Sequence, residues 1–246
     1  MARFVILYSP VKDVFKNFSF YKVNIVMTNF FGERLFFSII ITSFAIACTT
    51  AFASSHEIKI NSINKKLAAL EKTTGGRIGL YAIDTENNVR FQYRARERFP
   101  FCSTAKVIVV SAILKKSITD PHFLQQNVVY KKNELVSYSP ITKNHINGGI
   151  TVSELCAAAL TLSDNSAANL LIKKLGGLTA INAFARSIGD KQFELDRLEP
   201  QLNSAIPGDI RDTTTPEAMA NSLKRLTLGD ILAFPQLIQL QTWLKK

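Results

Sequence analysis

The stretch Ser103-Thr-Ala-Lys-Val-Ile-Val-Val-Ser-Ala-Ile-Leu-Lys-Lys116 decides how the rest of the chain is interpreted. It is apolar on almost every side, and lysines close its last turn. A helix of this kind is buried in the middle of a core, and basic residues suit the negative end of the helix dipole. We therefore predict a central buried helix that begins at Ser103.

Ser103 and Lys106 are three residues apart at the start of this helix, so their side chains lie on one face. A lysine in that position can activate a serine as a nucleophile. The free backbone N–H groups at a helix start can also stabilise an oxyanion. The S-x-x-K pattern alone is weak, because it recurs at Ser9, Ser19 and Ser62, none of which opens a buried helix.

Two further groups of residues follow downstream. The triplet Ser163-Asp-Asn165 occurs once, in a turn between two predicted helices, whereas chance gives it about 0.04 times in such a chain. Read alone, it is also an ordinary helix N-cap. Within the long loop 193–214, Glu199 and Asn203 are four residues apart and could hold one water as a general-base site. A lone loop glutamate is usually solvated and idle.

These three elements, in this order and in these contexts, resemble the class A β-lactamases. The resemblance covers about residues 57–246. It implies an α+β fold of the serine β-lactamase and penicillin-binding type, in which an all-helical lobe accompanies an antiparallel sheet lobe flanked by helices.

The resemblance also implies catalytic roles. Ser103 would be the nucleophile, Lys106 its proton partner and Ser163 the shuttle to the lactam nitrogen. Glu199 would hold the hydrolytic water together with Asn203. Whether Lys106 or Glu199 takes the first proton is disputed for the family, and the sequence leaves that question open.

Other residues gain roles only from the resemblance. Asn165 would bind the substrate amide, Tyr138 would wall the cleft, and Arg197 with Asp212 would form an ion pair that closes the loop. From the residues alone, Tyr138 is an ordinary partly buried tyrosine. The two loop charges would be surface residues that contribute little.

The spacing of apolar residues and the residues that end helices predict the remaining helices and strands. An amphipathic helix runs from Glu57 to Leu70 and is stopped by Gly75 and Gly76, and a β-hairpin follows over 77–84 and 89–94. Further helices are expected over 151–160 behind a capping box, from 166 to the glycines at 176–177, over 178–188, from 215 to about 226, and after Pro235 to the end.

The N-terminal residues predict export. The apolar run Leu35–Cys48 is followed by Ala51-Phe-Ala53, so residues 27–53 resemble a cleaved secretory signal and the mature chain would begin near Ser54. Localisation in the periplasm follows. Residues 1–26 are interpreted as an over-extended start, and lipid anchoring at Cys48 is the alternative. The domain 54–246 would divide into the first part of the sheet lobe, 54–99, and the helical lobe, 100–246.

Composition limits the partners. The chain has 246 residues, 47% of them apolar, and a formal net charge of +11, but its basic residues are scattered, which argues against nucleic acid. The histidines at 56, 122 and 145 share no ligand spacing with each other or with the cysteines, so no metal is expected. We expect no cofactor, a small-molecule β-lactam substrate, no membrane contact after cleavage, and a monomer.

The sequence also departs from the family. The K-T-G strand expected after the last helix is absent, because the chain ends at Trp243-Leu-Lys-Lys246. We therefore expect a truncated member whose hairpin stands alone with open edges, a marginal arrangement in water. Cys102 resembles a carbapenem-active branch in which that cysteine bonds one much later in the chain, and the one cysteine that follows here, Cys156, is expected to be a buried apolar side chain without a function.

Three functions remain in competition. The leading prediction is a hydrolase that opens β-lactams by acylation and deacylation. The second is a β-lactam sensor or penicillin-binding protein that stays acylated, and the third is an inactive remnant. Glu199 and Asn203 favour hydrolysis, because an acylated sensor has no use for a water-holding carboxylate.

Overall fold

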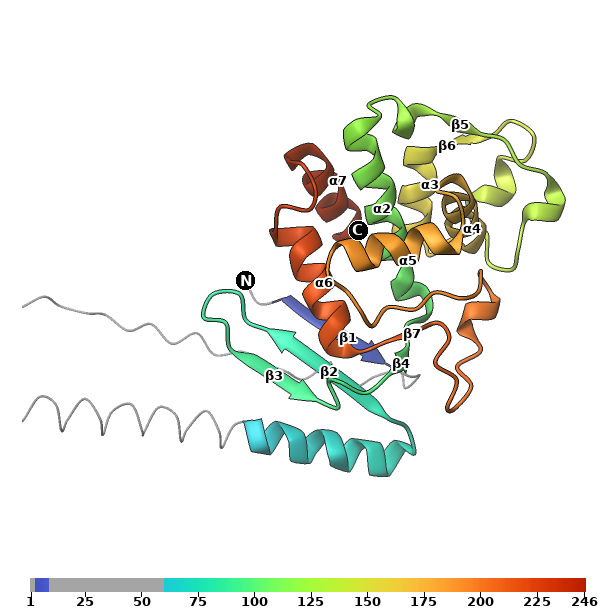
Figure 1. Cartoon of the computed structure of the whole chain (residues 1–246). Coiled ribbons are helices and arrows are strands. Elements are labelled where there is room, and N and C mark those ends of the chain that lie inside the picture. The colour runs from blue at the N-terminus through green and yellow to red at the C-terminus, as the bar shows by residue number, and fades with distance from the viewer. Residues whose placement is uncertain (1–2, 9–59) are drawn as a thin grey trace, which may run out of the picture. The chain divides into compact units, whose positions relative to one another are not determined.

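The computed structural model describes residues 3–8 and 60–246 (Figure 1). The chain divides into two compact units: one comprises Met1–Tyr8 and Gly79–Lys246, and the other spans Ser9–Ile78. The predicted signal, its cleavage site and the alternative anchor at Cys48 lie outside the described residues, so these stay predictions.

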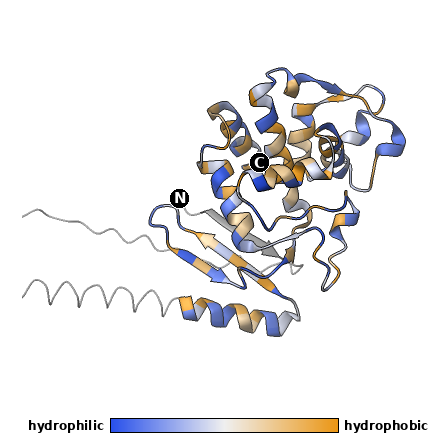
Figure 2. Cartoon of the chain, viewed as in Figure 1, coloured by the Kyte–Doolittle hydropathy of each residue, from blue (hydrophilic) through white to orange (hydrophobic). Residues whose placement is uncertain are grey.

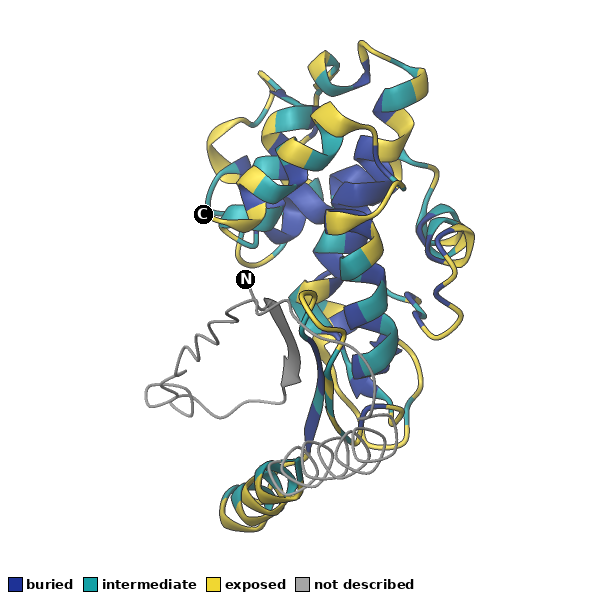
Figure 3. Ribbon diagram, turned by 90° about the vertical axis from the view of Figure 1, so that its left-hand side faces the viewer, coloured by how far each residue is buried: buried dark blue, intermediate teal, exposed yellow. Residues whose placement is uncertain are grey.

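The described part of the second unit is mainly a helix over residues 60–74. Its leucines and isoleucines are half-buried and its polar residues are mostly exposed (Figure 3). Gly75, at φ 69°, ends the helix with a left-handed residue whose N–H bonds the carbonyl of Glu71 at 2.9 Å. The predicted helix and its glycine stop are thus confirmed from residue 60 onward.

The main sheet has three strands in the order β1 (Arg3–Tyr8), β2 (Ile78–Ile83) and β3 (Arg90–Tyr93). β2 and β3 are antiparallel, with Leu80 opposite Tyr93. The turn between them closes where the N–H of Asp84 bonds the carbonyl of Val89 at 2.8 Å. The predicted hairpin is confirmed.

The expectation that this hairpin stands alone with both edges open is wrong at β2, because β1 lies beside that strand. The edge of an unpaired strand presents N–H and C=O groups that pair with any extended segment within reach. Residues 3–8 had no role predictable from the sequence, because a short apolar run does not by itself identify the strand it pairs with.

Helix α2 (Ala105–Thr119) is the centre of the larger unit (Figure 1). A 3₁₀ turn, η1 (Cys102–Thr104), precedes it, so the helical stretch begins at the predicted place but is not α-helical in its first residues. Ile108, Val110, Ile113 and Leu114 are fully buried, and apolar residues of the neighbouring helices pack around them (Figures 2 and 3). The prediction of a buried core helix is confirmed.

Five more helices complete this unit: α3 (Val152–Thr161), α4 (Asn165–Lys174), α5 (Leu178–Ser187), α6 (Pro216–Leu228) and α7 (Phe234–Leu244). The capping box at Thr151 is present, because Thr151 Oγ1 accepts from the N–H of Glu154 at 3.2 Å and the Glu154 carboxylate accepts from the N–H of Thr151 at 2.9 Å. Helix α7 begins before Pro235 rather than after it, since proline is tolerated in a first turn. None of the described helices is long and apolar enough to cross a bilayer.

Two short antiparallel ladders accompany the helices of this region. β4 (Phe99–Pro100) pairs with β7 (Thr213–Thr214), and β5 (Asn127–Val128) pairs with β6 (Ile150–Thr151). The remaining 3₁₀ turns are η2 (Phe123–Gln125), η3 (Lys132–Glu134), η4 (Thr142–Asn144) and η5 (Gln201–Asn203). Two-residue ladders and single turns carry no detectable period, which is why the pattern missed them. The α+β class is confirmed.

Candidate active site

Ser103 lies half-buried in the 3₁₀ turn that leads into α2. The residue before the turn, Phe101, is anchored twice. The N–H of Phe101 donates to the carbonyl of Asp212 at 3.2 Å, and the Phe101 ring stacks on Phe193 with centroids 4.8 Å apart. The first N–H groups of a helix have no partner within it, so the serine hydroxyl lies beside donors that can face an incoming carbonyl oxygen.

Lys106 is the most connected side chain of the site and only 3% exposed. Its ammonium lies 3.1 Å from Ser103 Oγ, 2.9 Å from Ser163 Oγ and 2.7 Å from Asn165 Oδ1. It also lies 2.8 Å from the carbonyl of Ser163 and 3.1 Å from Glu199 Oε1. Burial lowers the pKa of Lys106, and the negative charge of Glu199 opposes that shift without cancelling it.

The Ser163-Asp-Asn165 corner is held by its middle residue. Asp164 is fully buried and accepts from the N–H groups of Ile141 and Thr142, both at 2.9 Å. It also caps α4 by accepting from the N–H of Ala167 at 2.9 Å. Ser163 has a left-handed backbone, φ 55°, which turns the chain between α3 and α4 and points the corner at Lys106.

Asn165 connects two parts of the site. Its Oδ1 accepts from Lys106, and its Nδ2 donates to the carbonyl of Ser137 at 2.9 Å. Both ends of the amide predicted to bind substrate therefore have protein partners in this structure. The substrate-binding role of Asn165 stays a prediction.

Glu199 is 2% exposed and faces Lys106 through Oε1, while its Oε2 accepts from Asn203 Nδ2 at 2.6 Å. The predicted pairing of carboxylate and amide is therefore present. Asn169, which the sequence analysis missed, holds the backbone of Glu199 from both sides. Its Oδ1 accepts from the Glu199 N–H at 2.9 Å, and its Nδ2 donates to the Glu199 carbonyl at 2.8 Å. The available signal was its position one helical turn after Asn165, on the same face of α4.

The loop that carries Glu199 is closed by Arg197 and Asp212. The guanidinium Nε bonds Asp212 Oδ2 directly. Asp212 is fully buried, and its other oxygen accepts from the N–H groups of Asp196 at 2.8 Å and Arg197 at 3.0 Å. A buried carboxylate with this many donors is a structural anchor rather than a solvated surface charge.

Comparison with known proteins supports the same interpretation. The sequence model of the β-lactamase enzyme family matches residues 62–246. An ancestral class A β-lactamase (GNCA) superposes with a TM-score of 0.71 at 51% identity, over 73% of this chain and 69% of that one. The chain belongs to the class A β-lactamases.

Several relatives in this family are similar at the sequence level. β-Lactamase CTX-M-97 of Escherichia coli is 57% identical over 185 residues, and CTX-M-8 of Citrobacter amalonaticus is 53% identical over 201 residues. These alignments cover 75% and 81% of this chain, and 64% and 69% of the relatives. A β-lactamase from Desulfarculus baarsii superposes with a TM-score of 0.74 at 49% identity, over 76% of this chain and 69% of that one. The chain thus spans about 64% of the length of CTX-M-97.

The remaining predicted residues of this class A member lie as follows. Tyr138 is 66% exposed, and its carbonyl accepts from the N–H of Asn165 at 3.0 Å, so it borders the S-D-N corner. Cys102 is a free, half-buried thiol whose pKa is raised by burial and by the charges of Glu199 and Asp212. Cys156 is a free thiol inside the core.

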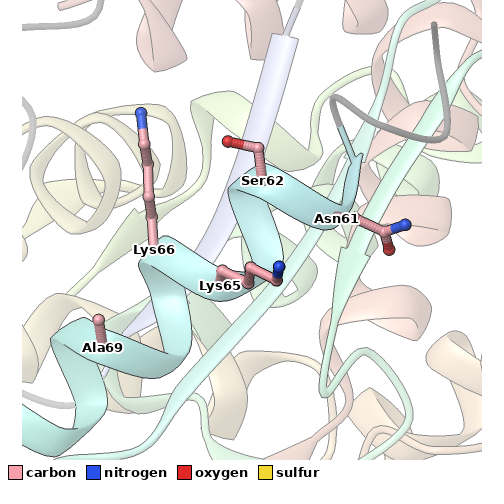
Figure 4. Close-up of a pocket in the computed structure, with 5 residues that line it drawn as sticks. All are labelled: Asn61, Ser62, Lys65, Lys66 and Ala69. Atoms are coloured by element: carbon pink, nitrogen blue, oxygen red, sulfur yellow. The ribbon is translucent and has the colours of Figure 1, made fainter.

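The second S-x-x-K pattern within the described chain provides a contrast. Ser62 and Lys65 are both exposed on the helix over residues 60–74, in a shallow hollow lined only by that helix (Figure 4). Unlike Ser103 and Lys106, this serine and lysine are not brought together in a buried site. Residues 3–8 and 60–246 contain no cluster of three or more His, Cys, Asp or Glu side chains suited to a metal.

Proposed function

We propose that the chain hydrolyses β-lactam antibiotics through an acyl-enzyme formed on Ser103. The observation that supports this best is the position of Lys106 Nζ, which lies within 3.1 Å of Ser103 Oγ, Ser163 Oγ and Glu199 Oε1. One ammonium thereby connects the nucleophile, the proton shuttle and the carboxylate needed for water attack.

Acylation would begin when Ser103 Oγ attacks the lactam carbonyl carbon. Its proton passes to neutral Lys106, or through a water to Glu199. The negative oxygen that forms is stabilised by N–H groups at the start of α2. When the C–N bond breaks, the nitrogen takes a proton from Ser163 Oγ, and Lys106 Nζ resupplies that hydroxyl.

Deacylation would use the other side of the site. Glu199 and Asn203 hold a water, and Glu199 takes one of its protons as the oxygen attacks the ester. The ester bond to Ser103 breaks, and the proton taken up by Glu199 returns to the serine oxygen, so that both groups regain their starting states. Asn203 donates to one oxygen of Glu199, which orients the carboxylate.

The proposal extends to the setting of the reaction. The substrate is a small-molecule β-lactam, and the segment 27–53 exports the chain to the periplasm, where hydrolysis contributes to resistance. Cleavage of that segment would leave β1 out of the mature sheet. Arg197 and Asp212 keep the loop in place, and Tyr138 and Asn165 contact substrate.

The test is a nitrocefin assay on the whole chain, with intact mass after exposure to penicillin. We expect turnover by the wild type, no adduct in Ser103→Ala, and a persistent adduct in Glu199→Gln. The matched control is Glu194→Gln, a loop glutamate paired with Arg186 at 2.8 Å, which should turn over like the wild type. A stable adduct on the wild type would replace hydrolysis by the sensor function, and neither adduct nor turnover would mean an inactive protein.

A further inference from the structure

A hollow of about 820 Å³ lies beside the catalytic site, lined by residues of α4, the start of α5 and the loop segment 198–201. Most of its larger side chains are apolar: Val136, Leu170, Ile172, Leu178 and Leu198. Of the residues with a predicted catalytic role, Glu199 lines it, whereas Ser103, Lys106 and Ser163 do not. The hollow is therefore a second space that meets the catalytic site at Glu199.

The size and lining are those of a small-molecule site. Ligand pockets in proteins usually enclose roughly 300–1,000 Å³, with an apolar lining and a few polar groups. Leu198 in the loop is 42% exposed, and Leu178 at the start of α5 is half-buried. An apolar ligand that lies against both leucines removes their surface from water, which favours binding.

The charged groups of the hollow already have partners within the protein. Lys173 Nζ lies 2.8 Å from Glu134 Oε1. Glu199 lies 3.1 Å from the ammonium of Lys106 and accepts from the side-chain amide of Asn203. A charged ligand would lose its hydration here without gaining a free partner of opposite charge, which costs binding free energy. The ionised residues therefore favour an uncharged ligand.

The polar groups that remain for a ligand are neutral. Thr179 and Gln201 line the hollow and are exposed, and neither side chain has a hydrogen-bond partner within residues 60–246. A hydroxyl and a primary amide can each donate and accept a hydrogen bond. They suit a ligand that carries a group of the same kind, such as an amide.

We propose that this hollow binds an uncharged small molecule with a flat apolar body and one amide group. The body lies between Leu178 and Leu198, and the amide exchanges hydrogen bonds with Thr179 and Gln201. Binding does not require β-lactam hydrolysis, so either claim can fail while the other holds.

Such a ligand would hold the loop against the helices. Leu198 directly precedes Glu199, whose N–H donates to Asn169 Oδ1 at 2.9 Å, and Asn169 also lines the hollow. The ligand contacts α5 and the loop at once, so it binds the state in which both are in place and not a state in which the loop has opened. Binding to one state alone lowers the population of the other by the factor 1 + [L]/Kd.

The first experiment is a two-dimensional ¹H–¹⁵N NMR titration of the whole chain with naphthalene-2-carboxamide. We expect saturable shifts at the backbone amides of Leu178 and Leu198 and at the side-chain amide of Gln201. The anionic naphthalene-2-carboxylate and the cationic 2-naphthylmethylammonium should both bind more weakly. A charged probe that binds as tightly as the carboxamide would overturn the proposal, as would shifts that do not saturate or that gather elsewhere.

Hydrogen exchange in the same samples tests the position of the ligand. The N–H of Glu199 donates to Asn169, and the N–H of Leu202 donates to the carbonyl of Leu198 at 3.0 Å. With ligand at ten times Kd, exchange of these two amides through loop opening should slow by about tenfold. Helix α3, which does not line the hollow, is the internal control. Unchanged exchange of both amides at saturation would contradict a ligand placed between α5 and the loop.

Two leucine variants form a matched pair. Leu198→Ala should weaken binding by about three- to fivefold, because the ligand loses apolar area to cover. Leu228→Ala should leave binding unchanged, because Leu228 ends α6 and does not line the hollow. The two side chains are 42% and 49% exposed, so neither change disturbs the core. Equal dissociation constants in the two variants would contradict the contact with Leu198.

Discussion

Lys106 has more polar neighbours than its ammonium can satisfy at once. Five oxygens lie within 3.1 Å of Nζ, whereas the group has three N–H donors. Small movements therefore exchange partners among Ser103, Ser163 and Glu199, which suits a group that passes protons between them. Because burial outweighs the nearby carboxylate, the pKa of Lys106 lies below its usual value.

This shift predicts the pH dependence of acylation. If Lys106 is the base, the acylation rate rises about tenfold per pH unit until the pH reaches the lowered pKa, because only the neutral amine accepts a proton. The rate would be followed by intact mass after rapid mixing with penicillin. Lys106→Arg should lack this rising limb, because a guanidinium cannot be deprotonated in this range. If the rate of Lys106→Arg still rises with pH, Glu199 and not Lys106 accepts the first proton.

Two asparagines on successive helices clamp the loop at different points. Asn169 of α4 pairs with both backbone groups of Glu199, and Asn182 of α5 pairs with both backbone groups of Leu195 at 2.8 and 2.9 Å. The two clamps have the same geometry, but only the first holds the residue that faces Lys106. The two helices thus fix the loop, and α4 fixes the backbone of Glu199.

The pair allows stability and catalysis to be separated. Asn169→Ala and Asn182→Ala each remove two hydrogen bonds and should lower the free energy of unfolding by about 1–3 kcal/mol, measured by urea titration. Only Asn169→Ala should slow deacylation, by up to about a hundredfold, because it releases the backbone of Glu199. Equal deacylation rates in the two variants would show that the Asn169 clamp serves stability alone.

At the scale of the whole molecule, the sheet combines strands that are far apart in the sequence. β1 comes from residues 3–8, whereas its neighbour β2 begins at residue 78. Most of β2 is buried, including Tyr81 and Ala82 at 2% exposure. Because β2 lies between β1 and β3, its hydrogen bonds to both should protect its backbone amides.

Proline in β1 tests this arrangement. Alternate residues of an edge strand direct their N–H toward the partner, so one of Val5→Pro and Ile6→Pro should remove a ladder hydrogen bond. That variant should lose protection over β2 by a factor of about five, the size expected for about 1 kcal/mol. The protection of the β2 amides is measured by hydrogen exchange with mass spectrometry, and helix α2, whose protection should not change, is the internal control. Unchanged exchange over β2 in both variants would mean that β1 does not protect it.

Local patterns were enough to predict most elements. The apolar run behind Ser103 predicted α2, the capping box at Thr151 predicted the start of α3, and Gly75 marked a helix end. Each of these depends on a few neighbouring residues, because helix caps, stops and burial periodicity are local properties. The short ladders β4–β7 and β5–β6 have no such signal and were missed.

The sequence by itself determined which residues could carry the chemistry: Ser103, Lys106, Ser163, Glu199 and Asn203 stand at spacings and in contexts that suit acyl transfer. Only the tertiary structure decided how they meet. Lys106 and Glu199 are 93 positions apart in the sequence, yet their charged atoms lie 3.1 Å apart. Packing of α4 against the loop also brought Asn169 to the backbone of Glu199, and strand pairing placed β1 beside β2. Contacts between distant residues arise from packing of whole elements, which leaves no local pattern to read.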